Sequence, residues 1–175
     1  MKKIILSVLG AGFLVFIAAA YGNDADVTKA IAVLNSTHNN KATGIVTFSK
    51  TELGVKVVAD IEGLTPGAHG FHIHQFGDCS APNADSAGGR YNPEEKPHGA
   101  PESRERHAGD LGNLIADERG KAHLERIDSV ISIGGQNSII GHGLIIHAAA
   151  DDMATQPTGN AGARVACGVI GIAGP

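Results

Sequence analysis

The stretch Gly44–Ile61, GIVTFSKTELGVKVVADI, contains two short runs in which hydrophobic residues recur with a period of two rather than with a helical period. Short runs of this kind, bounded by turn residues, are typical of β-strands. The same periodicity occurs on either side of this stretch, and the turn sequence Thr65-Pro66-Gly67 follows it. Four strands are therefore predicted, at Lys29–Asn35, Gly44–Lys50, Val55–Ile61 and Gly70–Phe76.

The second half of the chain continues the pattern. Four more strands are predicted, at Asn113–Asp117, Lys121–Ile127, Gly143–Ala149 and Arg164–Ile172. Two long irregular segments, residues 77–109 and 150–162, interrupt them, and long loops in a compact β domain are usually functional or disordered. Because no internal repeat or linker is present, the fold class is predicted to be all-β, one antiparallel barrel or sandwich of eight strands.

Composition limits the possible functions. The 175 residues allow one domain or two, and a content of 42% hydrophobic against 18% charged residues excludes intrinsic disorder. Basic residues number 14 against 18 acidic residues, without a run of like charge. This balance gives no support to binding of nucleic acid or of an anionic membrane surface.

The first twenty residues have the features of a secretory signal peptide. Lys2 and Lys3 precede an uncharged apolar stretch, residues 4–20, which ends in three alanines suited to cleavage. An uncleaved membrane anchor is the alternative, because 17 apolar residues approach the lower limit for spanning a bilayer. Cleavage would remove two lysines and take the formal charge from −4 to −6. We therefore expect a secreted, most simply periplasmic, domain of residues 21–175 without stable membrane association.

The chain has two cysteines, Cys79 and Cys167, and both lie in the part expected to be exported. An even pair in an oxidising compartment most simply forms a disulfide. Thiolate metal ligands are the alternative, although neither cysteine has a second cysteine or a histidine at ligand spacing.

Histidines are concentrated in one region, since eight of the nine lie between His69 and His147. Side chains alternate along a strand, so His72 and His74 are expected on one face, about 7 Å apart at the backbone. His147, after the apolar run Leu144-Ile145-Ile146, is a plausible third ligand for the same ion. The residues His98, His107 and Asp110 in the first long loop are ligand types that zinc accepts.

Three longer segments carry a resemblance to a known family. They are GFHIHQFGD at residues 70–78, HAGDLGN at 107–113 and TGNAGARVACG at 158–168. In this order they resemble the signature stretches of copper/zinc superoxide dismutase. The resemblance implies an eight-stranded Greek-key barrel, immunoglobulin-like in architecture, with copper and zinc as cofactors, superoxide anion as substrate and, in many members, a homodimer.

The resemblance also implies roles for particular residues. It implies copper ligands at His72, His74 and His147, zinc ligands at His98, His107 and Asp110, a linking carboxylate at Asp151, an anion-guiding Arg164 and a Cys79–Cys167 disulfide. His38, His69, His123 and His142 match no ligand and are expected at the surface or in local hydrogen bonds. Ala148, Ala149 and Ala150 replace charges found in some members, which predicts weaker electrostatic steering.

One position departs from the family pattern. Where members carry a histidine that bridges copper and zinc, this chain has Arg90, within SAGGRYNP at residues 86–93. Arginine cannot exchange protons near neutral pH, so water would have to supply them, and zinc would keep three protein ligands. A guanidinium about 5 Å from a divalent ion would be repelled by about 6–7 kcal/mol at an effective dielectric constant near 20. We therefore expect the Arg90 side chain to turn outward.

Two functions are compatible with these residues. The first is a secreted superoxide dismutase with altered efficiency, because the bridging histidine is replaced. The second is a non-enzymatic periplasmic relative that binds copper or zinc. A metal-free β module is less favoured, because six ligand-type residues would then have no role.

Overall fold

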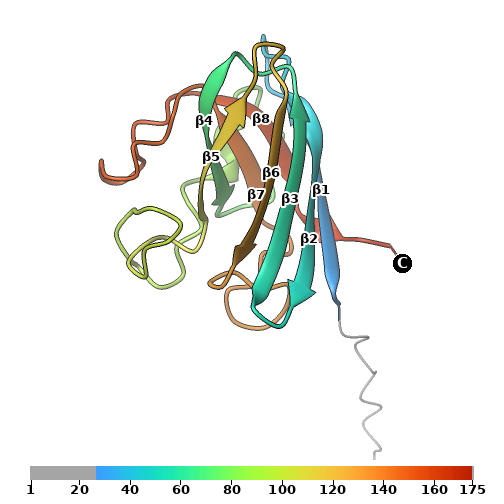
Figure 1. Ribbon diagram of the computed structural model, residues 1–175, viewed down its shortest axis with the longest axis vertical. Coiled ribbons are helices and arrows are strands. Elements are labelled where there is room, and N and C mark those ends of the chain that lie inside the picture. The colour runs from blue at the N-terminus through green and yellow to red at the C-terminus, as the bar shows by residue number, and fades with distance from the viewer. Residues whose placement is uncertain (1–26, 175) are drawn as a thin grey trace, which may run out of the picture.

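A computed structural model describes residues 27–174, so the predicted leader, residues 1–20, lies outside the described residues. The described chain is almost entirely β-structure joined by loops (Figure 1). Its elements are β1 (Lys29–Ser36), β2 (Thr43–Thr51), β3 (Gly54–Glu62), β4 (Gly67–His74), the 3₁₀ turn η1 (Asp85–Ala87), β5 (Asp110–Ala116), β6 (Ala122–Asp128), β7 (Gly143–His147), β8 (Arg164–Val169) and β9 (Gly171–Ile172).

The strands pair antiparallel in the order β5-β4-β7-β8-β1-β2-β3-β6, with the short β9 beside β1. Strands β3 and β4 are consecutive in the chain but are separated by four strands in the sheet. This crossover, and the return of β5 and β6 to the two ends of the order, gives a nearly closed Greek-key barrel (Figure 1). The predicted fold class is confirmed.

Because side chains alternate along a strand, every second residue of β2 and β3 points into the barrel. Val46 and Phe48 of β2 face inward and are fully buried, as are Val57 and Ala59 of β3. Strand β7 differs, because all five of its residues are buried. Its outer face is covered by the first long loop, where Ile145 packs on Ala84, Ala87 and Cys167.

The disulfide between Cys79 and Cys167 is present and joins residues 88 apart in the sequence. It fixes the start of the first long loop to β8. Both long loops, residues 77–109 and 150–162, lie on the side of the barrel where β4 and β5 run (Figure 1). The loops therefore lie beside β4, the strand that carries His69, His72 and His74.

Several predicted boundaries were wrong: β4 begins at Gly67 rather than Gly70, β7 ends at His147 rather than Ala149, and Arg164–Ile172 is divided into β8 and β9. Two further differences lie close to the histidines. Asp110 was expected in an irregular loop, yet it begins β5 and lies opposite His72, next to a register shift between Gly70 and His72. Strand β4 ends at His74 rather than Phe76, because the N–H groups of Gln75 and Phe76 donate to carbonyl groups of the loop instead.

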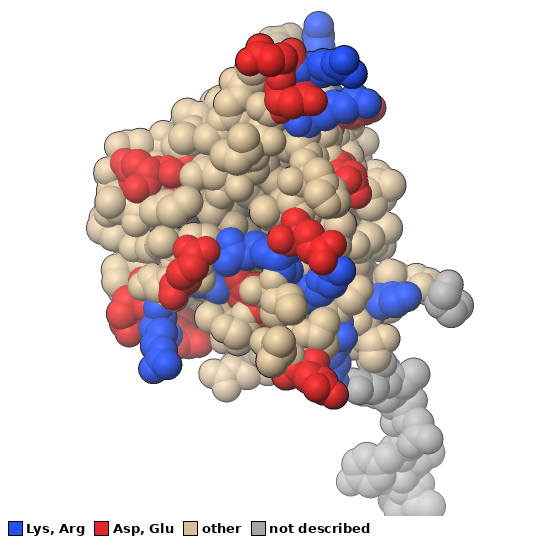
Figure 2. Space-filling model, viewed as in Figure 1, with Lys and Arg blue, Asp and Glu red and all other residues tan. Residues whose placement is uncertain are grey.

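The distribution of charge on the surface agrees with the nearly balanced numbers of acidic and basic residues. On the face shown in Figure 2, Lys and Arg are interspersed with Asp and Glu and form no broad patch of one sign. Within residues 27–174, no helix has the length and apolar character required to cross a bilayer.

Candidate metal centre

Two adjacent strands place three histidines together on the loop-covered side of the sheet. Phe71 and Ile73 of β4 point into the core, so His72 and His74 point to the opposite face, as predicted. His147 ends β7, the neighbour of β4. The ring of His147 lies 5.0 Å from that of His72 and 5.6 Å from that of His74, measured between centroids.

A second group lies beside the first. His98, His107 and Asp110 are buried, and each offers one ligand atom within 4.8 Å of the others. The Nδ1 atoms of both histidines and Oδ1 of Asp110 are buried and make no hydrogen bond. Buried lone pairs that converge without a donor are costly unless a cation lies among them. This group therefore fits a divalent ion such as zinc, which accepts imidazole nitrogen and carboxylate oxygen.

Asp151 connects the two groups. Its carboxylate accepts a hydrogen bond of 2.6 Å from Nε2–H of His72 and one of 2.9 Å from Nε2–H of His98. Burial raises the pKa of Asp151, but hydrogen bonds from His72, from the Met153 N–H and from His98 outweigh it and lower that pKa to about 2. The carboxylate is thus charged at neutral pH and leaves Nδ1 of both imidazoles free of a proton.

The other two histidines of the first group are held by the backbone. Nδ1–H of His74 donates to the Gly88 carbonyl at 2.9 Å, and Nδ1–H of His147 donates to the Gly162 carbonyl at 3.0 Å. Each ring therefore presents Nε2 as an acceptor. Burial, partly offset by these hydrogen bonds and reinforced by the nearby Arg90 charge, lowers the pKa of His74 to about 2 and that of His147 to about 3.

In this structure the Arg90 side chain does not turn outward, contrary to the expectation above. Its side chain is only 3% exposed, and Nη1 lies 2.9 Å from Nε2 of both His74 and His147. The backbone explains the direction, because Arg90 pairs with His74 in an isolated antiparallel bridge and opposed residues point to the same face. Two imidazole acceptors and the Thr158 carbonyl stabilise the buried charge. The repulsion of about 6–7 kcal/mol applies when a divalent ion is bound nearby, and these acceptors oppose it.

Arg164 lies at the mouth of this centre. Its guanidinium donates to the Ala84 carbonyl at 2.6 Å and to the Gly88 carbonyl at 2.7 Å. It lines a small pocket of about 150 Å³ together with His74, Arg90 and His147. A pocket of this size and positive charge fits a very small anion.

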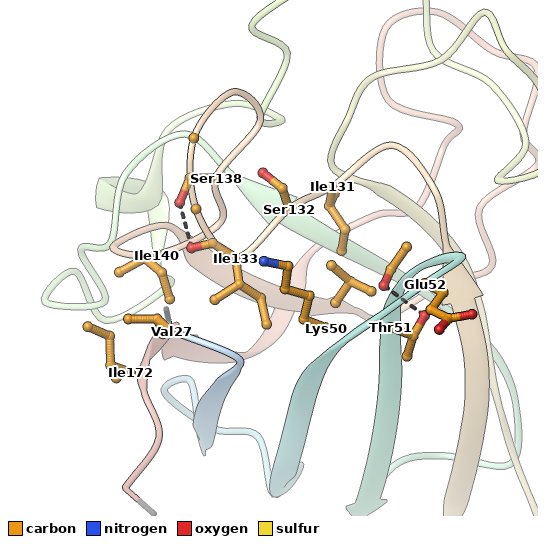
Figure 3. Close-up of a pocket in the computed structure, with 14 residues that line it drawn as sticks. Val27, Lys50, Thr51, Glu52, Ile131, Ser132, Ile133, Ser138, Ile140 and Ile172 are labelled. Carbon is orange, nitrogen blue, oxygen red and sulfur yellow. Dashed lines mark hydrogen bonds between the residues drawn. The ribbon is translucent and has the colours of Figure 1, made fainter. Parts of the chain in front are cut away.

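A larger groove lies elsewhere. It has a volume of about 960 Å³ and is lined by apolar and small residues such as Val27, Ile131 and Ile133, with the Lys50 side chain across it (Figure 3). None of the nine histidines lines it. We place the chemistry at the smaller pocket because the converging ligand atoms and perturbed pKa values are there.

Comparison with known proteins identifies the family. The family described as copper/zinc superoxide dismutase (SODC) matches residues 42–170. The chain is 46% identical to superoxide dismutase [Cu-Zn] 2 of Mesembryanthemum crystallinum, over 83% of this chain and 96% of that protein. It is 43% identical to extracellular superoxide dismutase [Cu-Zn] of Brugia pahangi, over 82% of this chain and 75% of that protein. The chain belongs to the copper/zinc superoxide dismutase family.

A solved structure extends the agreement to the fold. The crystal structure of the clock protein EA4 superposes with a TM-score of 0.77 at 43% identity, covering 83% of this chain and 95% of that one. The predicted family, its enzyme class and its two cofactors, copper and zinc, are thus confirmed at the level of the copper/zinc superoxide dismutase family.

Sequence reasoning missed several residues that position the centre. Asn113 clamps Asp151 with two hydrogen bonds, from its side-chain amide to the Asp151 carbonyl and from the Asp151 N–H to its Oδ1. Arg106, fully buried, donates to the carbonyl groups of His107, Ala108 and Asp110. The only signal in the sequence was their position inside or beside the family motif at residues 107–113.

Proposed function

We propose that the protein is a superoxide dismutase in which His72, His74 and His147 hold copper and His98, His107 and Asp110 hold zinc. The observation that supports this most strongly is the joining of the two ligand groups by one carboxylate, Asp151, on a copper/zinc superoxide dismutase scaffold. When bound, copper supplies the one-electron couple by which one superoxide is oxidised to dioxygen and a second is reduced to hydrogen peroxide. The three histidines offer three neutral imidazole nitrogens, a donor set that suits copper.

The residues around the pocket have distinct tasks in this proposal. The positive charge of Arg164 attracts and orients the superoxide anion in the small pocket. Burial lowers the pKa of Arg90 to about 10, so this guanidinium stays charged at neutral pH and cannot return a proton to the product. Protons must come from water, and efficiency should fall as pH rises.

The test is dismutation of superoxide by purified protein loaded with copper and zinc. Activity that depends on copper supports the proposal. Stable binding of both metals without activity supports the alternative, a non-enzymatic periplasmic copper- or zinc-binding relative. Arg90→His should restore a titratable imidazole between the two groups and raise activity most at neutral and higher pH. Equal activity of parent and fully loaded Arg90→His across pH would refute the role given to the replaced histidine.

Separate metal sites can be tested by substitution of single ligands. His147→Ala should lower copper affinity and spare zinc, whereas His98→Ala should lower zinc affinity and spare copper. Metal analysis after dialysis against a chelator measures both. Equal loss of both metals in each variant would contradict the assignment of two ligand sets.

We propose that the protein also forms a homodimer. Val33 of β1 and Ile45 of β2 lie opposite each other and are 55% and 48% exposed, and Val169 of β8 is 44% exposed. Exposed apolar side chains on adjoining strands fit an interface with a second copy. Sedimentation of the parent as a dimer and of Val33→Asp as a monomer is the expected result, and a monomeric parent would exclude the dimer.

We propose that residues 1–20 are a cleaved leader and that residues 21–175 act outside the cytoplasm, in the periplasm. The disulfide and the likeness to an extracellular relative support secretion. The mass of the exported protein tests this, since an uncleaved leader or two free thiols would contradict it.

A further inference from the structure

The guanidinium of Arg90 makes an unusual set of contacts for a buried cation. A single nitrogen, Nη1, lies 2.9 Å from Nε2 of His74 and 2.9 Å from Nε2 of His147. Both rings already donate from Nδ1 to backbone carbonyl groups, so both Nε2 atoms accept. Arg90 thus engages two of the three imidazole lone pairs that are proposed to hold copper.

The backbone and one further contact hold the side chain in this position. Tyr91 N–H donates to the Ile73 carbonyl and Gln75 N–H donates to the Gly89 carbonyl, both at 2.9 Å, so Arg90 is fixed opposite His74. Nη2 donates to the Thr158 carbonyl at 3.1 Å.

The remaining guanidinium nitrogen faces the second metal group. Nε of Arg90 makes no hydrogen bond and lies 3.8 Å from Oδ1 of Asp110. The zinc ligand atoms of His98, His107 and Asp110 are therefore not occupied by Arg90. The guanidinium thus touches one ligand group and only borders the other.

We propose that Arg90 is an internal cation that occupies the copper position of the metal-free protein, so that copper binds only by displacing the guanidinium while zinc binds without displacement. The proposal rests on the copper assignment made above and adds a selectivity-determining residue to it. Each Nε2 has one lone pair, which cannot accept an N–H hydrogen bond and bind a metal ion at once. Copper and the observed Arg90 conformation are therefore mutually exclusive at His74 and His147.

The effect of Arg90 on the affinity for each metal follows from the hydrogen bonds that metal binding breaks. Copper binding breaks two charge-assisted hydrogen bonds, which are stronger than neutral ones. Either ion brings a divalent charge close to the guanidinium, since Nε also lies 3.8 Å from Oδ1 of Asp110, so this repulsion does not distinguish copper from zinc. Zinc binding at the second group breaks neither hydrogen bond. Arg90 consequently lowers the affinity for copper much more than that for zinc, and it makes the metal-free protein selective for zinc.

The test measures metal affinities of metal-free protein by competition with chromophoric chelators. Arg90→Met keeps the length of the side chain but has no donor and no charge. We expect its affinity for Cu²⁺ to exceed that of the parent by about 100-fold, in line with the loss of two charge-assisted hydrogen bonds, and its affinity for Zn²⁺ to change by less than about tenfold. Arg119→Met removes the same charge from an exposed turn and should change neither affinity.

A second measurement uses only the parent chain and so does not depend on the folding of a variant. If the guanidinium must leave first, the rate of Cu²⁺ uptake in stopped-flow mixing levels off as the Cu²⁺ concentration rises. The rate of Zn²⁺ uptake should rise in proportion to the Zn²⁺ concentration. Uptake of Cu²⁺ in strict proportion to concentration, together with equal Cu²⁺ affinity of parent and Arg90→Met, would overturn the proposal.

These outcomes are separate from the fate of the proposed function. If Arg90→Met binds copper more tightly but the protein lacks dismutase activity, the role of Arg90 as an internal cation is supported and the dismutase function is rejected. If the parent is an active dismutase and binds Cu²⁺ as tightly as Arg90→Met, the dismutase function is supported and the role of Arg90 as an internal cation is rejected.

Discussion

Removal of the Cys79–Cys167 disulfide should destabilise the protein by an amount that the structure allows us to calculate. The bond spans 88 residues. In the chain-entropy treatment, a loop of this length lowers the entropy of the unfolded chain by about 15 cal/mol/K, or about 4–5 kcal/mol at 25 °C. The double substitution Cys79→Ala and Cys167→Ala should lower the free energy of unfolding by about this amount, because the remaining packing of the small cluster around Ile145 is largely kept.

Urea unfolding of the metal-free protein, with a chelator present, measures this difference without a contribution from bound metal. The dependence of the unfolding free energy on urea should become steeper in the double variant, because an unfolded chain without the cross-link exposes more surface. Reductant should bring the parent to the stability of the double variant and leave the double variant unchanged.

A loss below about 2 kcal/mol, with the native spectrum retained, would refute the loop-entropy reasoning. Hydrogen exchange gives an independent check. The disulfide fixes the loop whose Gly88 carbonyl accepts hydrogen bonds from His74 and Arg164. Amide protons of residues 79–90 should therefore exchange faster in the double variant, and equal protection there would show that the loop is held by other contacts.

Three further substitutions test how the site is supported. Gly159, at a φ of 62°, faces the Asp151 carboxylate, so Gly159→Ala places a methyl group against it and should weaken zinc binding about 10- to 100-fold in a chelator titration. The control Gly135→Ala, at a φ of 76° with open space around it, should leave zinc binding unchanged. The Thr155 hydroxyl and backbone N–H lower the pKa of Asp152 to about 2, so this group stabilises the fold above its unfolded pKa and less as pH falls toward 2. The stability difference between the parent and Asp152→Asn should accordingly shrink from pH 5 to pH 2, and a constant difference would contradict this. Arg106→Lys loses a buried fork of hydrogen bonds to one carboxylate and three carbonyl groups and should lower the free energy of unfolding by about 3 kcal/mol in urea, whereas an unchanged midpoint would contradict the role.

The sequence alone was enough for the fold class and for the residue types of the site. Hydrophobic residues with a period of two in stretches such as Gly44–Lys50 and Val55–Ile61 predict strands with one buried face, and β2 and β3 have that pattern. The order of the three motifs indicated the family. Spacing placed His72 and His74 on one face, because alternation along a strand is a local property.

The tertiary structure decided what depends on contacts between distant segments. Asp110 begins a strand because it pairs with His72, 38 positions earlier in the chain, and Asp151 joins the two ligand groups because Asn113 holds its backbone.

The direction of Arg90 is the clearest case. The positive charge of arginine predicts repulsion from a metal site, but the bridge to His74 turns the side chain inward. There it donates hydrogen bonds to Nε2 of two imidazoles that carry their protons on Nδ1. The outcome depends on the tautomers of His74 and His147, which are set by the carbonyl groups of Gly88 and Gly162. Because these contacts join residues remote in sequence, the conformation of Arg90 could be determined only once the fold had brought them together.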